Sequence, residues 1–241
     1  RIAATFFVSL GPDRSVSWWR RFAGPPFISD AAREELERLA ESEHETGMAP
    51  FDPVKWDEEA AHADRSWTRR QLEPAADVYE RVFDSPPCCF GAAGFQVNPH
   101  LFALEEEMGL RFGADVRGQT IFLPRAQRVD GSVPQIPATL PSVPEALRER
   151  GVNEKNVHEY LFDLSQKLPA TGHCWRITAE DEGEHFLDTV EKMLVMWRGS
   201  QREIGPAGGL LDRVASEGML RHQIGWVRSV HGDYEAAQSV Q

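Results

Sequence analysis

The sequence predicts a single α/β domain, spanning residues 1–241, in which strands alternate with helices. The chain is long enough to bury one large core. Short apolar runs alternate along it with helical patterns of ten or more residues, and no internal repeat interrupts them. Such alternation is typical of parallel strands joined by right-handed crossovers, so we expect a barrel or an open doubly wound sheet.

The strands follow from apolar runs that stop at turn residues. Ile2–Leu10 is expected to be a buried strand that ends at Gly11-Pro12-Asp13. Further strands are expected at residues 44–51, 88–96, 110–114 and 174–179, and a terminal hairpin or strand at 224–230.

The helices follow from apolar residues at helical spacing behind capping residues. They are expected at residues 31–43, 57–83, 98–108, 153–168 and 184–197. Asp30 and Asn98 are expected to cap the first and third of these helices, and Pro74 to divide or bend the second.

Composition excludes several classes of function. The net charge of -12 repels nucleic-acid phosphates. No apolar run approaches the length of a membrane span, no export signal is visible, and the three cysteines form no Cys-x-x-Cys pair. The odd, sparse cysteine count favours a reducing compartment. Because the chain opens at Arg1 just before an apolar run, we expect a truncated or processed chain.

Six ordered segments resemble the polysaccharide deacetylase (NodB-homology) family, in particular its aminoarabinose-lipid deformylase branch. They read ATFFVSLGPD (4–13), HETG (44–47), AAGF (92–95), DVRG (115–118), PQIPATLP (134–141) and AEDEG (179–183). The resemblance implies a distorted (β/α) barrel of about seven strands with a divalent metal at its C-terminal mouth. The metal activates water, an Asp acts as base and a His as acid, and the substrate is undecaprenyl phosphate carrying 4-formamido-arabinose.

Most residues that this resemblance assigns to catalysis are replaced. The two expected histidine ligands fall on Ala49 and Pro53, which cannot coordinate a metal, and the expected acid histidine falls on Thr178. The expected arginine falls on Gln96. The strand with the base and the metal-binding aspartate would precede residue 4, so the barrel is expected to lack its first strand.

We therefore expect no metal cofactor in this form, where the family uses zinc, cobalt or manganese. The candidate catalytic positions are Asp115 and Thr178. The candidate substrate-binding residues are Gly94, Gln96, Gln135, Glu180 and Glu182. A turn role for Asp115, and a solvated helix start for the acidic cluster at 180–184, are the plain alternatives. A replacement metal site of His44, Asp52 and His173 is a minor alternative.

Two partner predictions remain. Trp18, Trp19, Arg20 and Arg21 favour peripheral membrane contact, with an ordinary packed loop as the alternative. The exposed edge of Ile2–Leu10 favours either an oligomer or coverage by residues 224–230.

Cys88-Cys89 are interpreted as core or loop residues without a catalytic role.

We therefore expect a deformylase-like chain with impaired hydrolysis. The resemblance implies that it is cytoplasmic and acts on a lipid-linked amino sugar at the inner membrane face. The alternatives are a non-catalytic sugar-lipid-binding or regulatory protein, and a truncated or engineered copy of an active enzyme.

Overall fold

The computed structural model describes residues 2–13, 26–167, 169, 171–214, 218–228 and 235–240. Trp18, Trp19, Arg20 and Arg21, for which we expect membrane contact, lie outside these residues. None of the described helices is long and apolar enough to cross a membrane.

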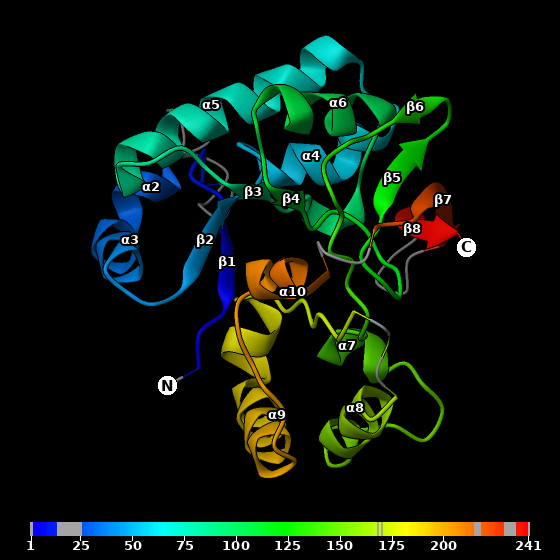
Figure 1. The fold of residues 1–241 in the computed structure, drawn as a ribbon. Helices are drawn as coiled ribbons and strands as arrows, with labels where there is room; N and C mark the ends of the chain where they lie inside the picture. Colours follow the sequence, from blue (N-terminus) through cyan, green and yellow to red (C-terminus); the bar gives the residue numbers. More distant parts are fainter. Residues whose placement is uncertain are drawn as a thin grey trace.

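A parallel sheet forms the first half of the molecule (Figure 1). Its strands, in spatial order, are β1 (Thr5–Val8), β2 (Glu45–Met48), β3 (Cys89–Phe90) and β4 (Phe112–Gly113). Each strand pairs in parallel with its neighbour, as in the pairs Thr5 with Glu45 and Phe90 with Gly113. The α/β class and the parallel strands are thus confirmed. The number of seven barrel strands stays a prediction.

Helical crossovers connect these strands and cover one face of the sheet. They are α2 (Ile28–Ala31), α3 (Arg33–Ala40), α4 (Pro53–Glu59), η1 (Ala60–His62), α5 (Arg65–Phe83), η2 (Ala93–Phe95) and α6 (Pro99–Glu107). Their apolar residues enclose a core that includes Trp56, Phe90 and Phe102, none of which is exposed. Asn98 caps α6 as predicted, accepting from the backbone N–H groups of His100 and Leu101.

Two local predictions are wrong. Asp30 does not cap a helix that starts at residue 31. It lies within α2, and the helix is interrupted at Ala32 before α3 begins. Pro74 does not divide α5, which continues through it over 19 residues, and a bend at Pro74 stays a prediction. The packing of residues such as Leu72 and Tyr79 against the core outweighs the loss of one backbone hydrogen bond at the proline.

A second sheet contains the C-terminal strands. Its order is β6 (Val129–Asp130), β5 (Leu123–Ala126), β7 (Arg221–Arg228) and β8 (Glu235–Val240). The antiparallel pairing of β7 with β8 confirms the terminal hairpin. It also shows that the predicted coverage of β1 by residues 224–230 is wrong for the described residues 224–228, because these pair with β8, while residues 221–223 of the same strand pair with β5.

Segments without regular strands link the two sheets. Single bridges join Gly113 to Gln135 and Arg117 to Gln238. Residues 174–179 form no strand, contrary to expectation, although the Cys174 carbonyl accepts from Thr139 N at 2.9 Å. After β4, the chain is therefore held to neighbouring segments by single β-bridges rather than by regular strands.

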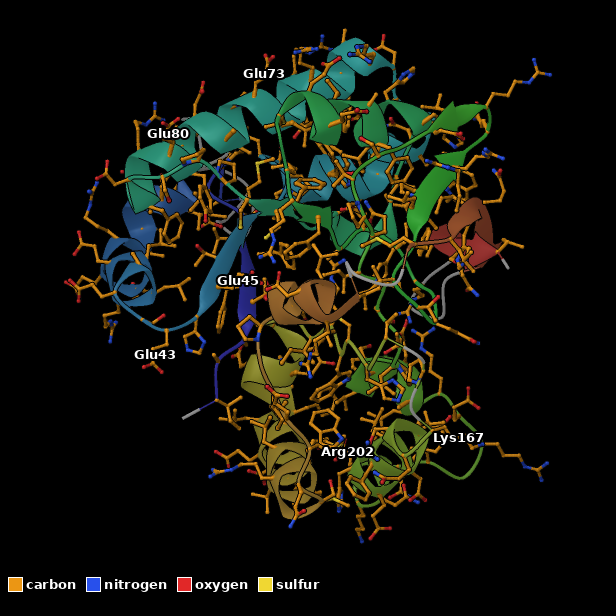
Figure 2. The ribbon with its side chains drawn as sticks, viewed as in Figure 1. Glu43, Glu45, Glu73, Glu80, Lys167 and Arg202 are labelled. Carbon is orange, nitrogen blue, oxygen red and sulfur yellow. The ribbon has the colours of Figure 1, made fainter. Side chains whose placement is uncertain are left out.

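The remaining helices lie on the other side of the parallel sheet (Figure 1). They are α7 (Val143–Ala146), α8 (Val157–Ser165), η3 (Asp181–His185), α9 (Leu187–Gly199) and α10 (Ala207–Val214). The carboxylate of Glu45, labelled beside α10 in Figure 2, accepts from Gly208 N at 3.0 Å. Leu211 of α10 packs with Phe112 and Cys89 on this face, which fixes the helix against the sheet.

Candidate functional site

The C-terminal ends of the parallel strands bring residues far apart in sequence together. Ala49 follows β2, Ala92 follows β3, and Asp115 follows β4. The Asp115 Oδ1 oxygen accepts a hydrogen bond from Ala92 N at 2.8 Å, across the ends of neighbouring strands. Because ligands of α/β proteins bind beyond this end of the sheet, it is the natural place for a site.

Asp115 belongs to a fully buried polar network. Its backbone N–H donates to Gln135 Oε1 at 3.2 Å, and Gln135 Nε2 donates to Glu105 Oε2 at 3.1 Å. None of the three residues is exposed. The structure thus brings together two predicted site residues, Asp115 and Gln135, and adds Glu105 from α6, which the sequence analysis did not identify.

The two carboxyl groups of this network face each other beside Gly113. As carboxylates, Asp115 Oδ2 and Glu105 Oε1 have no hydrogen-bond donor among the described residues. A Cβ atom on Gly113 would lie 2.3 Å from the first oxygen and 2.6 Å from the second, so only glycine leaves room for both. One proton shared between the two oxygens satisfies both of them.

Burial accounts for the protonation of this pair. Desolvation, reinforced by the Asp115 charge, raises the pKa of Glu105 well above its usual range. Desolvation also raises the pKa of Asp115, against the opposing hydrogen bonds from Glu105, Ala92 N and Gln135. We therefore assign the proton mainly to Glu105, with the Asp115 carboxylate as its acceptor.

Arg176 is a site residue that the sequence analysis missed. Its Nη2 donates to the Ala92 carbonyl at 2.6 Å and its Nη1 to the Ala114 carbonyl at 3.3 Å, so the guanidinium lies across the ends of β3 and β4. Burial lowers the pKa of Arg176, while the nearby Asp115 charge opposes this shift. The available signal was a single arginine in the otherwise strand-like stretch 174–179.

Phe95 lies against two guanidinium groups. The Cζ atoms of Arg117 and Arg176 are 4.5 and 4.6 Å from the centre of its ring, within cation–π range. Phe95 has φ 55° and Gly94 φ 58°, so two successive residues adopt the left-handed region. A left-handed phenylalanine costs about 1–2 kcal/mol, and such strain is concentrated at functional sites.

Gly94 and Gln96 serve as supports on either side of Phe95. A Cβ atom on Gly94 would lie 1.6 Å from Asp57 Oδ1, so glycine allows α4 to pack against this loop. The Gln96 carbonyl accepts from Trp56 Nε1 at 2.8 Å, and the Gln96 side chain is buried. Contact of either residue with a substrate stays a prediction.

The acidic cluster after residue 179 separates into buried and exposed members. Glu182 is fully buried, and its carboxylate accepts from Val143 N and Thr178 N, both at 2.8 Å. Thr178 and Glu180 are exposed. Both Glu182 oxygens thus accept hydrogen bonds from the backbone. Thr178 and Glu180, at the same bend, are accessible to solvent. The catalytic role of Thr178 and the substrate-binding roles of Glu180 and Glu182 stay predictions.

The side chains present do not fit the metal that the resemblance implies. Ala49 and Pro53 occupy the expected histidine positions, and Pro53 begins α4. No group of three or more His, Cys, Asp or Glu side chains suited to a metal ion occurs in the described part of the chain. His44 precedes β2 and accepts from Ala4 N, whereas Asp52 follows β2 at its other end, so the replacement site with His173 does not assemble.

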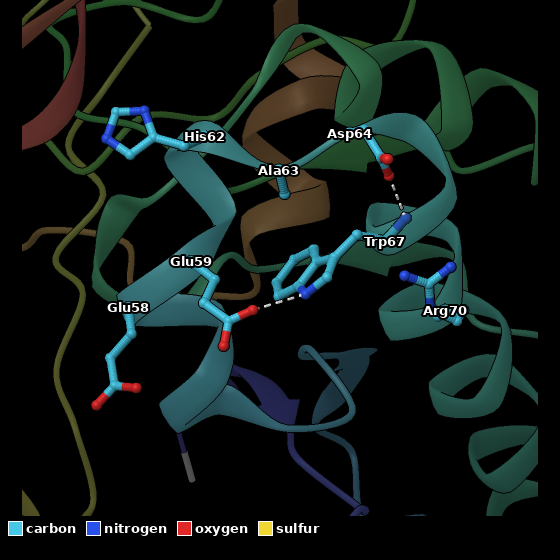
Figure 3. A pocket seen from close by; sticks show the side chains of 7 residues that line it. All are labelled: Glu58, Glu59, His62, Ala63, Asp64, Trp67 and Arg70. Atoms are coloured by element: carbon cyan, nitrogen blue, oxygen red, sulfur yellow. Dashed lines mark hydrogen bonds between the residues drawn. The ribbon is translucent and has the colours of Figure 1, made fainter.

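A separate acidic pocket lies in the outer helical layer (Figure 3). The residues that line it are Glu58, Glu59, His62, Ala63, Asp64, Trp67 and Arg70. Trp67 Nε1 donates to Glu59 Oε2 at 2.9 Å, so one of the acidic side chains that line the pocket already has a partner. None of the predicted site residues lines this pocket.

Comparison with known proteins finds a curated deformylase similar to this chain. No family model matches it. A curated relative named "Probable 4-deoxy-4-formamido-L-arabinose-phosphoundecaprenol deformylase ArnD", from Shewanella sediminis, is 22% identical over 88% of this chain and 76% of its own length.

Solved structures of deacetylases and of a related esterase share the fold of this chain. A structure from Mycobacterium smegmatis, described as that of a polysaccharide deacetylase, superposes with a TM-score of 0.63 at 15% identity, over 90% of this chain and 73% of the other. A family 4 acetyl xylan esterase from Clostridium thermocellum, solved with a cobalt ion, reaches 0.51 at 10% identity, over 91% and 84%. The predicted resemblance in fold and branch is confirmed.

Proposed function

Because the chain has the fold of the polysaccharide deacetylases and resembles their deformylase branch in sequence, we propose that it binds a lipid-linked amino sugar without hydrolysing it in this form. The binding site is the C-terminal end of the parallel sheet, and the protein acts at the inner membrane face. The deformylase name of the curated relative, which specifies a sugar on phosphoundecaprenol, supports this class of ligand.

The observation that carries the proposal is the chemistry at and near the C-terminal ends of β2 and β4. An apolar alanine and a proline ring, at positions 49 and 53, offer no lone pair to a cation. Thr178 presents a hydroxyl that does not titrate near neutral pH, so it cannot protonate a leaving amine as an imidazolium would. Asp115, the remaining candidate catalytic carboxylate, uses Oδ1 for Ala92 N and Oδ2 for the proton that it shares with Glu105.

The same strand ends still provide polar groups for recognition. Half-buried Arg176, Arg117 and Phe95 line this edge, and their positions are fixed by the strand-end carbonyls, by Glu145 and by the left-handed loop. Sugars and phosphates bind to such fixed donors beside aromatic rings. This arrangement favours binding over hydrolysis.

One experiment on the purified chain tests the proposal. Elemental analysis, a formate-release assay and calorimetric titration with the 4-formamido-arabinose lipid in detergent are performed on the same sample. We expect saturable binding, no stoichiometric transition metal and no formate. Bound metal with turnover contradicts the claim of impaired hydrolysis, and the absence of saturable binding contradicts the claimed ligand.

A further inference from the structure

Arg176 has unused hydrogen-bonding capacity at the strand ends. A guanidinium carries five N–H donors, and two of them are accounted for by the carbonyls of Ala92 and Ala114. Among the described residues no carboxylate forms an ion pair with Arg176. Its remaining donors are therefore available to an anion from outside.

Three carboxyl groups at this edge of the sheet are buried. Asp115 and Glu105 are fully buried, and their shared proton leaves the pair with one negative charge. Glu145, which pairs with Arg117, is 5% exposed, whereas the Arg117 side chain is 21% exposed. Arg117 and Arg176 are thus partly exposed cations beside buried carboxyl groups, on a chain whose net charge is -12.

The arrangement of the two cations is fixed before any ligand arrives. Arg117 is held by Glu145, which also forms the capping box at the start of α7 with Ser142. Arg176 is held by the two strand-end carbonyls, and Phe95 lies within 4.6 Å of both guanidinium groups. Groups ordered in advance lose little conformational entropy on binding.

We propose that Arg176, with Arg117 beside it, binds the phosphate group of an anionic ligand at the ends of β3 and β4. The planar fork of N–H donors matches two phosphate oxygens, so arginine binds phosphate through two parallel hydrogen bonds, whereas lysine acts as a single point charge. The inference rests on the proposed function, in which that phosphate belongs to the lipid carrier. Free phosphate has the same chemistry and is the second source to test.

Titrations with defined probes distinguish these sources. The wild-type chain is titrated with inorganic phosphate by NMR, and with phosphatidylcholine vesicles containing undecaprenyl phosphate by co-sedimentation, against plain phosphatidylcholine vesicles. We expect shifts of the amide signals of residues 92 and 114, and sedimentation only with the doped vesicles. Binding of inorganic phosphate alone would assign the site to a free anion, while binding of neither probe refutes the proposal.

Three variants locate the site. Arg176→Gln is expected to weaken binding about tenfold or more, because a charge-assisted pair is lost. Arg176→Lys keeps the charge but loses the fork and should weaken binding less. Arg38→Gln, which removes an exposed guanidinium paired with Glu35 on α3, is the matched control and should bind like the wild type.

The outcomes separate this inference from the proposed function. If Arg176→Gln binds both probes as the wild type does, the inference is wrong. Saturable binding of the amino-sugar lipid that is insensitive to Arg176 also refutes it, but leaves the proposed function intact. Phosphate binding that depends on Arg176, without binding of the amino-sugar lipid, supports the site and contradicts the proposed function. Should Arg176→Gln not fold, the Lys variant and the wild-type amide shifts decide.

Discussion

Replacing Glu105 and Asp115 by their amides, singly and together, tests whether these buried carboxyl groups share one proton. In Glu105→Gln, the amide oxygen accepts from Gln135 and the amide nitrogen donates to Asp115, so the network survives. In Asp115→Asn, the oxygen accepts from Ala92 N and the nitrogen donates to Glu105. In the double variant, two NH₂ groups face each other beside Gly113 without an acceptor.

The magnitude follows from the donors left without acceptors. Each single variant adds one spare N–H and should cost about 1 kcal/mol of unfolding free energy. The double variant should cost about 2–3 kcal/mol more than the sum of the singles, because buried donors without acceptors lose their hydration uncompensated. For a chain of this size, that excess lowers the melting temperature by roughly 5–10 °C.

Urea denaturation followed by circular dichroism measures these free energies. Glu106→Gln is the matched control, because Glu106 is the exposed neighbour on α6, and it should change stability by less than about 0.5 kcal/mol. Additive costs in the double variant would refute the shared proton.

The pH dependence of stability gives a second readout of the same pair. Because burial raises the pKa of Glu105 in the folded state, the folded chain keeps a proton that the unfolded chain releases. The unfolding free energy should therefore fall as pH rises above the ordinary carboxyl range, by up to about 1.4 kcal/mol per pH unit, until the pH passes the folded pKa. Glu105→Gln should remove this slope, and an unchanged slope would assign it to other groups.

Three other predictions concern separate features. Gly113→Ala should cost more than about 2 kcal/mol in urea denaturation, since its Cβ would lie 2.3 Å from Asp115 Oδ2, whereas Gly199→Ala, with no atom near, should not destabilise the chain. Cys88 is exposed, and a hydrogen bond from Cys89 lowers its pKa to about 7. The rate of alkylation of Cys88 by iodoacetamide should therefore increase as the pH rises through about 7, and the labelling should disappear in Cys88→Ser. Faster labelling of another cysteine would contradict this prediction. Burial lowers the pKa of His222, so stability should fall as pH drops through about 6.5, and a His222→Gln variant that keeps the same slope would show that another group is responsible.

The sequence by itself determined features that depend on neighbouring residues. Apolar runs ending in turn residues located β1 to β4, and Asn98 located the start of α6, because strands and caps form from local contacts. The ordered segments also located the fold family and showed that Ala49 and Pro53 stand where ligands were expected. These conclusions required no knowledge of which strand lies beside which.

The tertiary structure alone decided which side chains meet. Arg176 reaches the Ala92 carbonyl across 84 residues, and Gln135 joins Glu105 across 30, because segments beyond β4 return to its end. The depth of burial, set by α6 over the sheet, makes Asp115, a candidate catalytic position in the sequence, one half of a proton-sharing pair. Local sequence carries no record of such contacts, since desolvation and strand-end geometry depend on how distant segments pack.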